Sequence, residues 1–251
     1  MNIFIPGEDA RMQALKEEAL ARRHTLTDAM DCDIGILPLP DSRSAYPPLL
    51  SIDGKGRTLL HGRLDPSHED ILRRHGWRLK NIQADEDYIR QNAFISAEGA
   101  LCAAMQRTAF TLRGARCVVV GYGRIAKELT RMLILLGARV RVVARRKSAR
   151  LKARFRGARA FDMNHMPQAF SDAQVLFNTI PCQIINAQAF ERLLPGTLVM
   201  ELASPPYGFD LSLAKNMGLD AVLESGIPSR YAPKTAAQLL MDHLEAGEQN
   251  G

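Results

Sequence analysis

The stretch Arg116-Cys117-Val118-Val119-Val120-Gly121-Tyr122-Gly123-Arg124-Ile125-Ala126 decides the fold of this chain. An apolar strand runs directly into the pattern G-x-G-x-x-A, which opens a helix that continues through Leu136. Gly121 permits the tight turn, Gly123 lets the backbone approach a pyrophosphate, and Ala126 lets the helix pack closely on the strand. The free N–H groups at the helix start favour phosphate. The stretch therefore predicts a Rossmann domain that binds a dinucleotide.

The residues after this stretch continue the same alternation of strand and helix. Further strands are predicted at 139–143, 174–178, 198–202 and 220–223, and helices at about 123–136, 186–194 and 210–217. Such a βαβ rhythm predicts a parallel, doubly wound sheet. The alternative is a Rossmann sheet whose glycine turn has lost its ligand.

The residues before it form a second alternation. Strands are predicted at 2–5, 34–37, 58–60 and 77–79, and helices at about 9–22 and 66–74, which indicates a small α/β domain. In the first helix, Met12, Leu15, Ala19 and Leu20 should lie on one buried side. We expect a two-domain α/β protein with a small-residue connector helix near 85–106. The N-terminal α/β domain covers 1–90 and regains the C-terminal helix 233–246, and the Rossmann domain covers 91–232.

The end of the second Rossmann strand indicates which cofactor is bound. NAD-preferring domains carry an acidic residue there, whereas this chain reads Ala144-Arg145-Arg146-Lys147-Ser148. A guanidinium can hold two oxygens of a ribose 2′-phosphate, so we predict NADP(H). Some of these cations could equally form a solvated face. The predicted cofactor-binding residues are Gly121, Gly123, Arg124 and Ile125 on the pyrophosphate, and Ala144, Arg145 and Arg146 around the 2′-phosphate.

Loops after two later strands should border the nicotinamide, because ligands of open α/β sheets lie outside the carboxyl ends of the strands. These loops are Asn178-Thr179-Ile180-Pro181 and Ala203-Ser204-Pro205-Pro206. The alternative for both is an ordinary turn that ends in proline.

Two further pairs are candidates for binding a polar substrate. Asn92 and Ser96 are four residues apart on the connector helix and share one face. Lys234 and Thr235 begin the last helix, where backbone N–H groups are free. Each pair could instead face solvent. The sequence indicates no metal site, and it assigns no acid–base catalytic residue.

Composition narrows the class of protein. The 251 residues are 46% hydrophobic and 24% charged, which is typical of a folded globular chain. The net charge is +6, and the densest basic stretch is 139–159. This stretch could form a nucleic-acid surface, a solvated face or a phosphate pocket. The glycine loop favours the phosphate pocket, so we expect neither nucleic acid nor membrane as a partner. The four cysteines form no C-x-x-C pair and no signal peptide is visible, which favours the cytoplasm.

Several segments resemble the A subunit family of bacterial dipicolinate synthase. They are Asn92-Ala93-Phe94-Ile95-Ser96-Ala97-Glu98-Gly99-Ala100, Gly121-Tyr122-Gly123-Arg124-Ile125-Ala126-Lys127, Leu136-Gly137-Ala138, Ala144-Arg145 and Ala232-Pro233-Lys234-Thr235-Ala236. The resemblance implies an NADP-dependent oxidoreductase that converts a dihydrodipicolinate from the lysine pathway into pyridine-2,6-dicarboxylate for endospores. It also implies that the partner is a flavoprotein-like B subunit, and we expect a homo-oligomer. The substrate carboxylates would be held by Asn92, Ser96, Lys234 and Thr235.

Two other functions fit the same pattern. A shikimate- or 2-hydroxyacid-type NADP dehydrogenase would share the two-domain plan but would need a general base near the substrate hydroxyl. A non-catalytic NADP(H)-sensing subunit would bind the cofactor and a protein partner without turning over a substrate.

Overall fold

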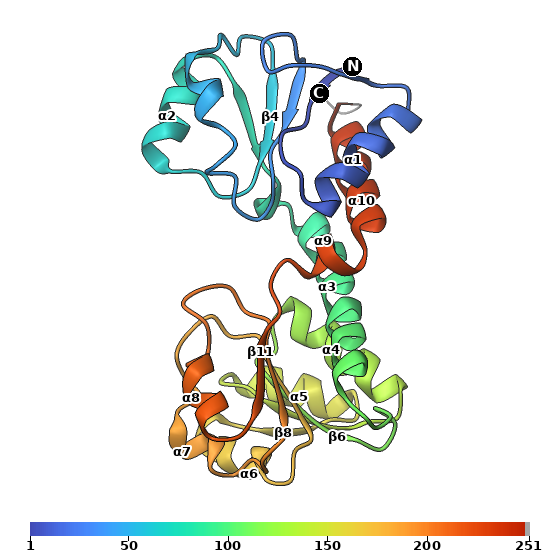
Figure 1. The fold of residues 1–251 in the computed structure, drawn as a ribbon, viewed down its shortest axis with the longest axis vertical. Helices are drawn as coiled ribbons and strands as arrows, with labels where there is room; N and C mark the ends of the chain where they lie inside the picture. The colour runs from blue at the N-terminus through green and yellow to red at the C-terminus, as the bar shows by residue number, and fades with distance from the viewer. Residues whose placement is uncertain (249–251) are drawn as a thin grey trace. The chain divides into compact units, whose positions relative to one another are not determined.

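The computed structural model describes residues 1–248, which divide into two compact units (Figure 1). Unit 1 contains Met1–Asn92 and the C-terminal segment from Pro228, and unit 2 contains Ala93–Ile227. The sequence predicts these boundaries after residue 90 and near residue 233. The predicted connector helix is α3 (Glu86–Arg107), and the first boundary between the units falls within it.

Unit 1 is built on a five-stranded parallel sheet in the order β2-β1-β3-β4-β5. Its strands are β1 (Asn2–Phe4), β2 (Thr25–Leu26), β3 (Ile34–Ile36), β4 (Thr58–His61) and β5 (Arg78–Asn81). In Figure 1, α2 (Pro66–Arg74) lies on one side of this sheet, and α1 (Ala10–Ala21) and α10 (Pro233–Glu248) lie together on the other. A buried cluster that includes Leu37, Tyr46, Leu59, Leu72 and Trp77 fills the core under α2.

Helices α1 and α10 run in the same direction. Near their starts, the Ser229 hydroxyl donates a hydrogen bond of 2.5 Å to Asp9 Oδ1, the cap of α1. At the other end, the Arg22 guanidinium donates to Asp242 at 2.7 Å and to Glu245 at 2.8 Å. The N-termini of both helices therefore lie at the same end of unit 1.

Unit 2 is a six-stranded parallel sheet in the order β11-β10-β9-β6-β7-β8, which is the Rossmann order. Its strands are β6 (Arg116–Val120), β7 (Arg139–Val143), β8 (Arg159–Phe161), β9 (Val175–Asn178), β10 (Leu198–Glu201) and β11 (Asp220–Leu223). The predicted doubly wound parallel sheet is thus confirmed. Residues Cys117 to Val120 of the central strand are fully buried, as its apolar sequence requires.

Helices of unit 2 connect these strands. They are α4 (Arg124–Leu135), α5 (Lys147–Phe155), η3 (Met163–His165), α6 (Met166–Phe170), α7 (Ala187–Phe190) and α8 (Leu211–Asn216). The short elements η1 (Pro47–Ser51) and η2 (Ile82–Ala84) belong to unit 1, and α9 (Ile227–Tyr231) leads into α10. No helix among residues 1–248 is long and apolar enough to span a bilayer.

The structure adds elements that the sequence did not predict and corrects one residue. The sequence analysis missed helix α5, which is rich in basic residues and buries only Ala153, and strand β8, which is a three-residue edge strand. The expected burial of Leu20 is wrong: its side chain is 56% exposed, whereas Met12, Leu15 and Ala19 are fully buried. Leu20 lies beyond the edge of the face that packs on the sheet.

Replacing Arg22 by Met should lower the free energy of unfolding of unit 1 by about 1–2 kcal/mol, because a largely buried guanidinium loses three carboxylate partners. The fluorescence of Trp77, the only tryptophan, reports urea unfolding of this unit. As a control, Arg73→Met removes one exposed pair with Glu69 and should change stability by less than about 0.5 kcal/mol. Equal losses in both variants would contradict the importance of the Arg22 network.

Candidate functional site

A cavity of about 460 Å³ lies at the carboxyl ends of the strands of unit 2. From β6 the chain proceeds first to β7 and β8 on one side and then to β9, β10 and β11 on the other, so this is the switch point of the sheet. The lining residues are Gly121, Tyr122, Gly123, Ala144, Arg145, Arg146, Ala149, Met163, Thr179, Ile180, Pro181, Cys182 and Ile184. Eight of the predicted cofactor residues therefore come together around one cavity.

The two glycines of the loop, Gly121 and Gly123, lack a side chain for different structural reasons. Gly121 has φ +107°, and a Cβ there would lie 2.2 Å from Thr179 Oγ1, so the fold itself requires glycine. Gly123 has no atom within 4 Å of the place where its Cβ would be. Apart from the adjoining backbone, no group of residues 1–248 occupies that space at the N-terminus of α4. An open cradle beside free backbone N–H groups fits the pyrophosphate of a dinucleotide.

The turn after β7 presents positive charge to the cavity. Arg145 and Arg146 are exposed, and among residues 1–248 neither guanidinium has a hydrogen bond or an ion pair. The turn itself is held by Arg150 of α5, whose Nη1 donates to the carbonyl oxygens of Ala144 at 2.9 Å and of Arg145 at 2.7 Å. The described lining of the cavity contains no carboxylate. The site is therefore suited to an anionic group.

Asn178, Arg124 and Ile125 are predicted cofactor residues that do not line this cavity. Arg124 and Ile125 form the first turn of α4. Asn178 is fully buried at the end of β9, where its Nδ2 donates to both oxygens of Glu201 at 2.7 and 2.9 Å. Asn178 thus orders the neighbouring loops rather than opening onto the cavity.

Glu201 joins the two loops that follow β9 and β10. Its carboxylate also accepts the backbone N–H of Gly208 at 2.7 Å and of Ala203 at 2.8 Å. Burial raises the pKa of this carboxyl above its usual value, although the hydrogen bonds from Gly208, Ala203 and Asn178 oppose the shift. Sequence reasoning missed Glu201, since a single acidic residue at the end of a strand has no distinctive pattern.

The predicted substrate residues lie on two helices. On α3, Asn92 is half-buried and Ser96 is 4% exposed, so Ser96 does not face solvent. Lys234 and Thr235 are exposed in the first turn of α10. The parallel packing of α1 and α10 brings this turn to the end of unit 1 where α1 begins.

Several lining residues were missed by the sequence analysis. Ala149, Met163 and Ile184 supply apolar walls, and Cys182 is a free, exposed thiol. Met163 lies two residues after the end of β8, so it could not be placed before that strand was known. Ala149 lies in the first turn of α5, a helix that the sequence analysis did not predict, so it could not be placed either.

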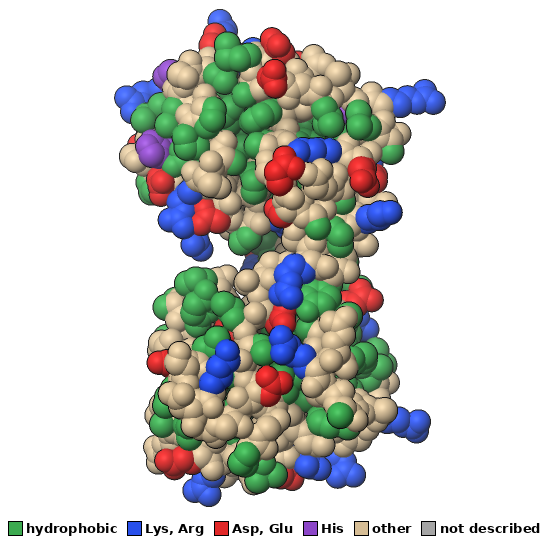
Figure 2. All heavy atoms as spheres, in the orientation of Figure 1, with side chains coloured by type: hydrophobic (Ala, Val, Ile, Leu, Met, Phe, Trp, Pro, Cys, Tyr) green, Lys and Arg blue, Asp and Glu red, His purple; other side chains and the backbone are tan. Residues whose placement is uncertain are grey.

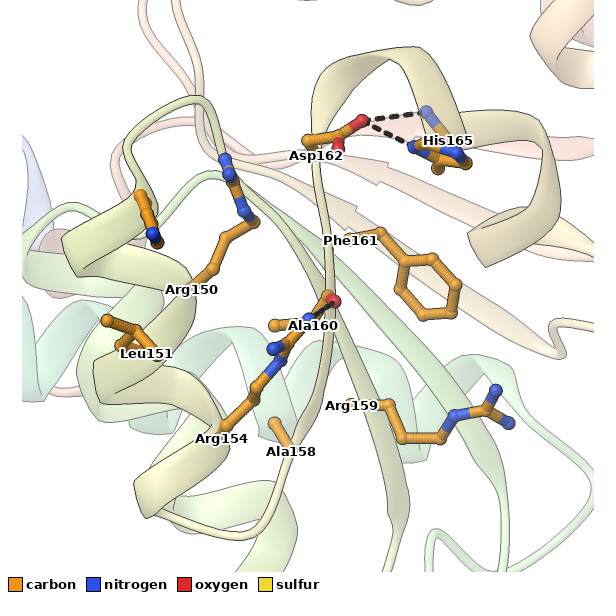
Figure 3. A pocket seen from close by; sticks show the side chains of 10 residues that line it. Arg150, Leu151, Arg154, Ala158, Arg159, Ala160, Phe161, Asp162 and His165 are labelled. Carbon is orange, nitrogen blue, oxygen red and sulfur yellow. Dashed lines mark hydrogen bonds and ion pairs between the residues drawn. The ribbon is translucent and has the colours of Figure 1, made fainter.

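A larger cavity of about 640 Å³ lies along the edge strand β8 (Figure 3). Arg150 and Arg154 reach it from α5, and Arg154 Nη2 donates to the carbonyl oxygen of Ala160 at 3.1 Å. Arg159 leaves the strand on the other side, where its guanidinium stacks on the ring of Phe161. Its three arginines lie on two sides of a strand and contact groups of the protein itself, so we consider this cavity a weaker anion site than the one at the glycine loop.

Basic side chains do not form one stripe on the face of the molecule shown in Figure 2, where Lys and Arg are scattered among Asp and Glu on each unit. Within the basic segment, Arg141 bonds to Asp172 and to the carbonyl oxygen of Ala169. This distribution agrees with a local phosphate pocket beside ordinary solvated arginines.

Comparison with known proteins agrees with this geometry. Residues 78–204, about half of the chain, match the family described as D-isomer specific 2-hydroxyacid dehydrogenase, NAD binding domain. The A subunit of dipicolinate synthase from Bacillus subtilis (strain 168) is 29% identical over 245 residues, which cover 88% of this chain and 82% of that protein.

Two solved structures share the fold over nearly the whole chain. The A subunit of dipicolinate synthase from Bacillus halodurans superposes with a TM-score of 0.85 at 24% identity, covering 98% of this chain and 96% of that one. Transhydrogenase from Sinorhizobium meliloti gives a TM-score of 0.73 at 14% identity, covering 98% and 94%. The chain resembles the A subunit of dipicolinate synthase, and through its nicotinamide-cofactor-binding domain it belongs to the D-isomer specific 2-hydroxyacid dehydrogenase family.

Proposed function

We propose that this protein is a dehydrogenase that oxidises a dihydrodipicolinate to pyridine-2,6-dicarboxylate with NADP⁺. The observation that carries the proposal is the cavity at the switch point, which combines the open cradle at Gly123 with Arg145 and Arg146, two cations without partners among residues 1–248. The dehydrogenase family match and the name of the Bacillus subtilis relative support the reaction class and the substrate.

The chain's own residues would hold the cofactor along the carboxyl edge of the unit 2 sheet. Gly121, Gly123, Arg124 and Ile125 would surround the pyrophosphate, and the turn Ala144-Arg145-Arg146 would bind the 2′-phosphate. The loop Asn178-Thr179-Ile180-Pro181 would border the nicotinamide, with Asn178 acting through its hydrogen bonds to Glu201. When bound, NADP⁺ supplies a hydride acceptor.

The proposed oxidation requires little catalytic assistance from the protein. The reaction removes a hydride and a proton from a dihydropyridine ring, and the aromatic product makes this loss favourable. The residues that matter most are then those that hold two carboxylates, for which we propose Asn92, Ser96, Lys234 and Thr235. We assign no acid–base residue.

The family match favours one rival, a 2-hydroxyacid dehydrogenase that oxidises an alcohol. The fold of D-lactate dehydrogenase from Escherichia coli is related, with a TM-score of 0.62 at 16% identity. Purified protein with NADP⁺ and either dihydrodipicolinate or D-lactate distinguishes the two functions by the appearance of NADPH. Formation of NADPH with D-lactate but not with dihydrodipicolinate would refute our proposal. A protein that binds NADPH but oxidises neither substrate would act as a sensor.

The cellular setting belongs to the same proposal. The relative is named as a subunit, so we propose that the partner is a flavoprotein-like B subunit, with a homo-oligomer of this chain. A cytoplasmic enzyme that serves the endospore is the setting that this reaction implies.

Gly123→Val should abolish NADPH binding while the protein stays folded, because the new side chain would enter open space that the pyrophosphate needs. Calorimetric titration with NADPH and the circular dichroism spectrum test both parts. Gly121→Ala is the contrasting variant and should lose stability, since its Cβ would meet Thr179. A folded Gly123→Val protein with normal affinity would contradict the cofactor site.

The double variant Arg145→Ala/Arg146→Ala should lose about 2–4 kcal/mol of NADP⁺ binding and almost no NAD⁺ binding, because only NADP⁺ carries the 2′-phosphate. Values of kcat/KM for both cofactors measure this. Arg139→Ala, an exposed arginine at the opposite end of β7, is the matched control and should change neither value. Equal losses for both cofactors, or a wild type that prefers NAD⁺, would refute the NADP assignment.

Lys234→Ala and Ser96→Ala should each raise the KM for the dicarboxylate more than the KM for NADP⁺. Loss of a charged hydrogen bond to a carboxylate should cost roughly 1.5–3 kcal/mol for the lysine. Lys215→Ala, which removes a lysine from the last turn of α8, serves as the control. Normal substrate kinetics in both variants would place the carboxylates elsewhere.

A further inference from the structure

Arg11 is a buried arginine in the first turn of α1 that belongs to none of the groups described above. Only 4% of its surface is exposed. Among residues 1–248, the one hydrogen-bond partner of its side chain is the carbonyl oxygen of Leu39, which accepts from Nη2. Its Nε is buried and has no partner within this part of the chain. A permanent positive charge is therefore enclosed without a counter-ion from the described part of the chain.

Neighbouring acidic groups do not compensate this charge. Asp9 is closest in sequence, but its Oδ1 accepts the backbone N–H of Arg11 at 2.9 Å and of Met12 at 3.2 Å, together with the Ser229 hydroxyl. Burying a guanidinium is unfavourable unless an anion pairs with it, and one neutral carbonyl oxygen satisfies a small part of its five donors. The environment is therefore incomplete without an anion.

Arg22, just beyond the end of the same helix, shows how this protein treats a structural arginine. That guanidinium binds Glu18, Asp242 and Glu245, all within 2.8 Å. A role limited to holding the Leu39 loop would need only a neutral donor, whereas Arg11 keeps a charge that the protein does not neutralise. The difference between the two arginines points to a ligand for Arg11.

The position of Arg11 within unit 1 agrees with such a ligand. Leu39 follows β3, so the guanidinium lies at the carboxyl edge of the sheet, where open α/β sheets bind ligands. Ser229 contacts both the Asp9 carboxylate and the Arg11 backbone N–H, at 2.5 and 3.3 Å. Five residues later, Lys234 begins the parallel helix α10. Two cations and two helix N-termini thus share one end of unit 1.

We propose that Arg11 binds a carboxylate of the substrate, with Lys234 and Thr235 at the same end of unit 1. The planar guanidinium matches the two oxygens of a carboxylate, and burial strengthens the pair. That the anion is a carboxylate of a dicarboxylate rests on the proposed function, whereas the need for an anion rests on the uncompensated charge alone.

Arg11→Met should raise the KM for dihydrodipicolinate and the Kd for pyridine-2,6-dicarboxylate by roughly ten- to a hundredfold, the effect of losing a charged hydrogen bond. The Kd for NADPH should stay unchanged. Its Tm should be no lower than that of the wild type, because the variant removes a buried, unpaired charge. Arg11→Lys keeps the positive charge but loses the planar pair of guanidinium donors. Its Kd for pyridine-2,6-dicarboxylate should fall between those of the wild type and Arg11→Met.

Arg22→Met is the matched control at the other end of α1, and it should show the opposite pattern, with a lowered Tm and unchanged ligand affinities. Wild-type affinity for pyridine-2,6-dicarboxylate in Arg11→Met would overturn the inference. A second result would also overturn it: Arg11→Met has a lowered Tm, Arg11→Lys restores the Tm, and both variants bind the ligand as the wild type does. Arg11 would then have a structural role.

Failure of the proposed function gives a different result. Should the wild type bind D-lactate or pyruvate but not pyridine-2,6-dicarboxylate, the dicarboxylate assignment is wrong. Weaker binding of that monocarboxylate by Arg11→Met would then still support a carboxylate site at Arg11. A wild type that binds none of these carboxylates, in the presence of NADPH, would overturn the inference.

Discussion

The turn at Gly121 is the constraint on which the cofactor half of the protein depends. Val120 pairs with both neighbouring strands, opposite Val143 on one side and Asn178 on the other, so the chain must leave the sheet abruptly after it. Positive φ at Gly121 makes this possible, and Thr179 fills the space beside it while its hydroxyl donates to the Val120 carbonyl oxygen at 2.8 Å. The same turn aims the start of α4 at the cavity, so fold and binding site share one backbone conformation.

The arginines of this protein differ in whether the protein supplies partners for their charge. Arginines such as Arg22, Arg141 and Arg154 use carboxylates or carbonyl oxygens of the protein as partners. Arg145 and Arg146 have no such partners among the described residues, and the buried guanidinium of Arg11 has only Leu39. A cation that the protein leaves uncompensated has a cost in stability, most of all when it is buried. These residues are therefore the ones that we connect with anionic ligands.

Glu201 organises the loops that follow β9 and β10. One carboxylate gathers the amide of Asn178 and the backbone N–H groups of Ala203 and Gly208. Gly208 must be glycine, because a Cβ there would lie 2.1 Å from Asn178 Nδ2. The raised pKa of Glu201 follows from its burial, and its hydrogen bonds keep the loops in place.

The sequence by itself determined the Rossmann sheet, the glycine loop and the basic turn at Arg145, because each depends on residues close together in the chain. The bounds of β6 follow from an apolar run, and those of β7 from the stretch Arg139-Val140-Arg141-Val142-Val143 after the turn at Gly137. Only the tertiary structure revealed α5, which buries a single residue, the short edge strand β8, and the pairing of Asn178 with Glu201, which are 23 residues apart. It also showed that Arg11 is buried with a single side-chain hydrogen-bond partner among residues 1–248. Whether a charge is buried and whether it has a partner depend on segments far away in the sequence, such as Leu39 and Ser229, and no local pattern records them.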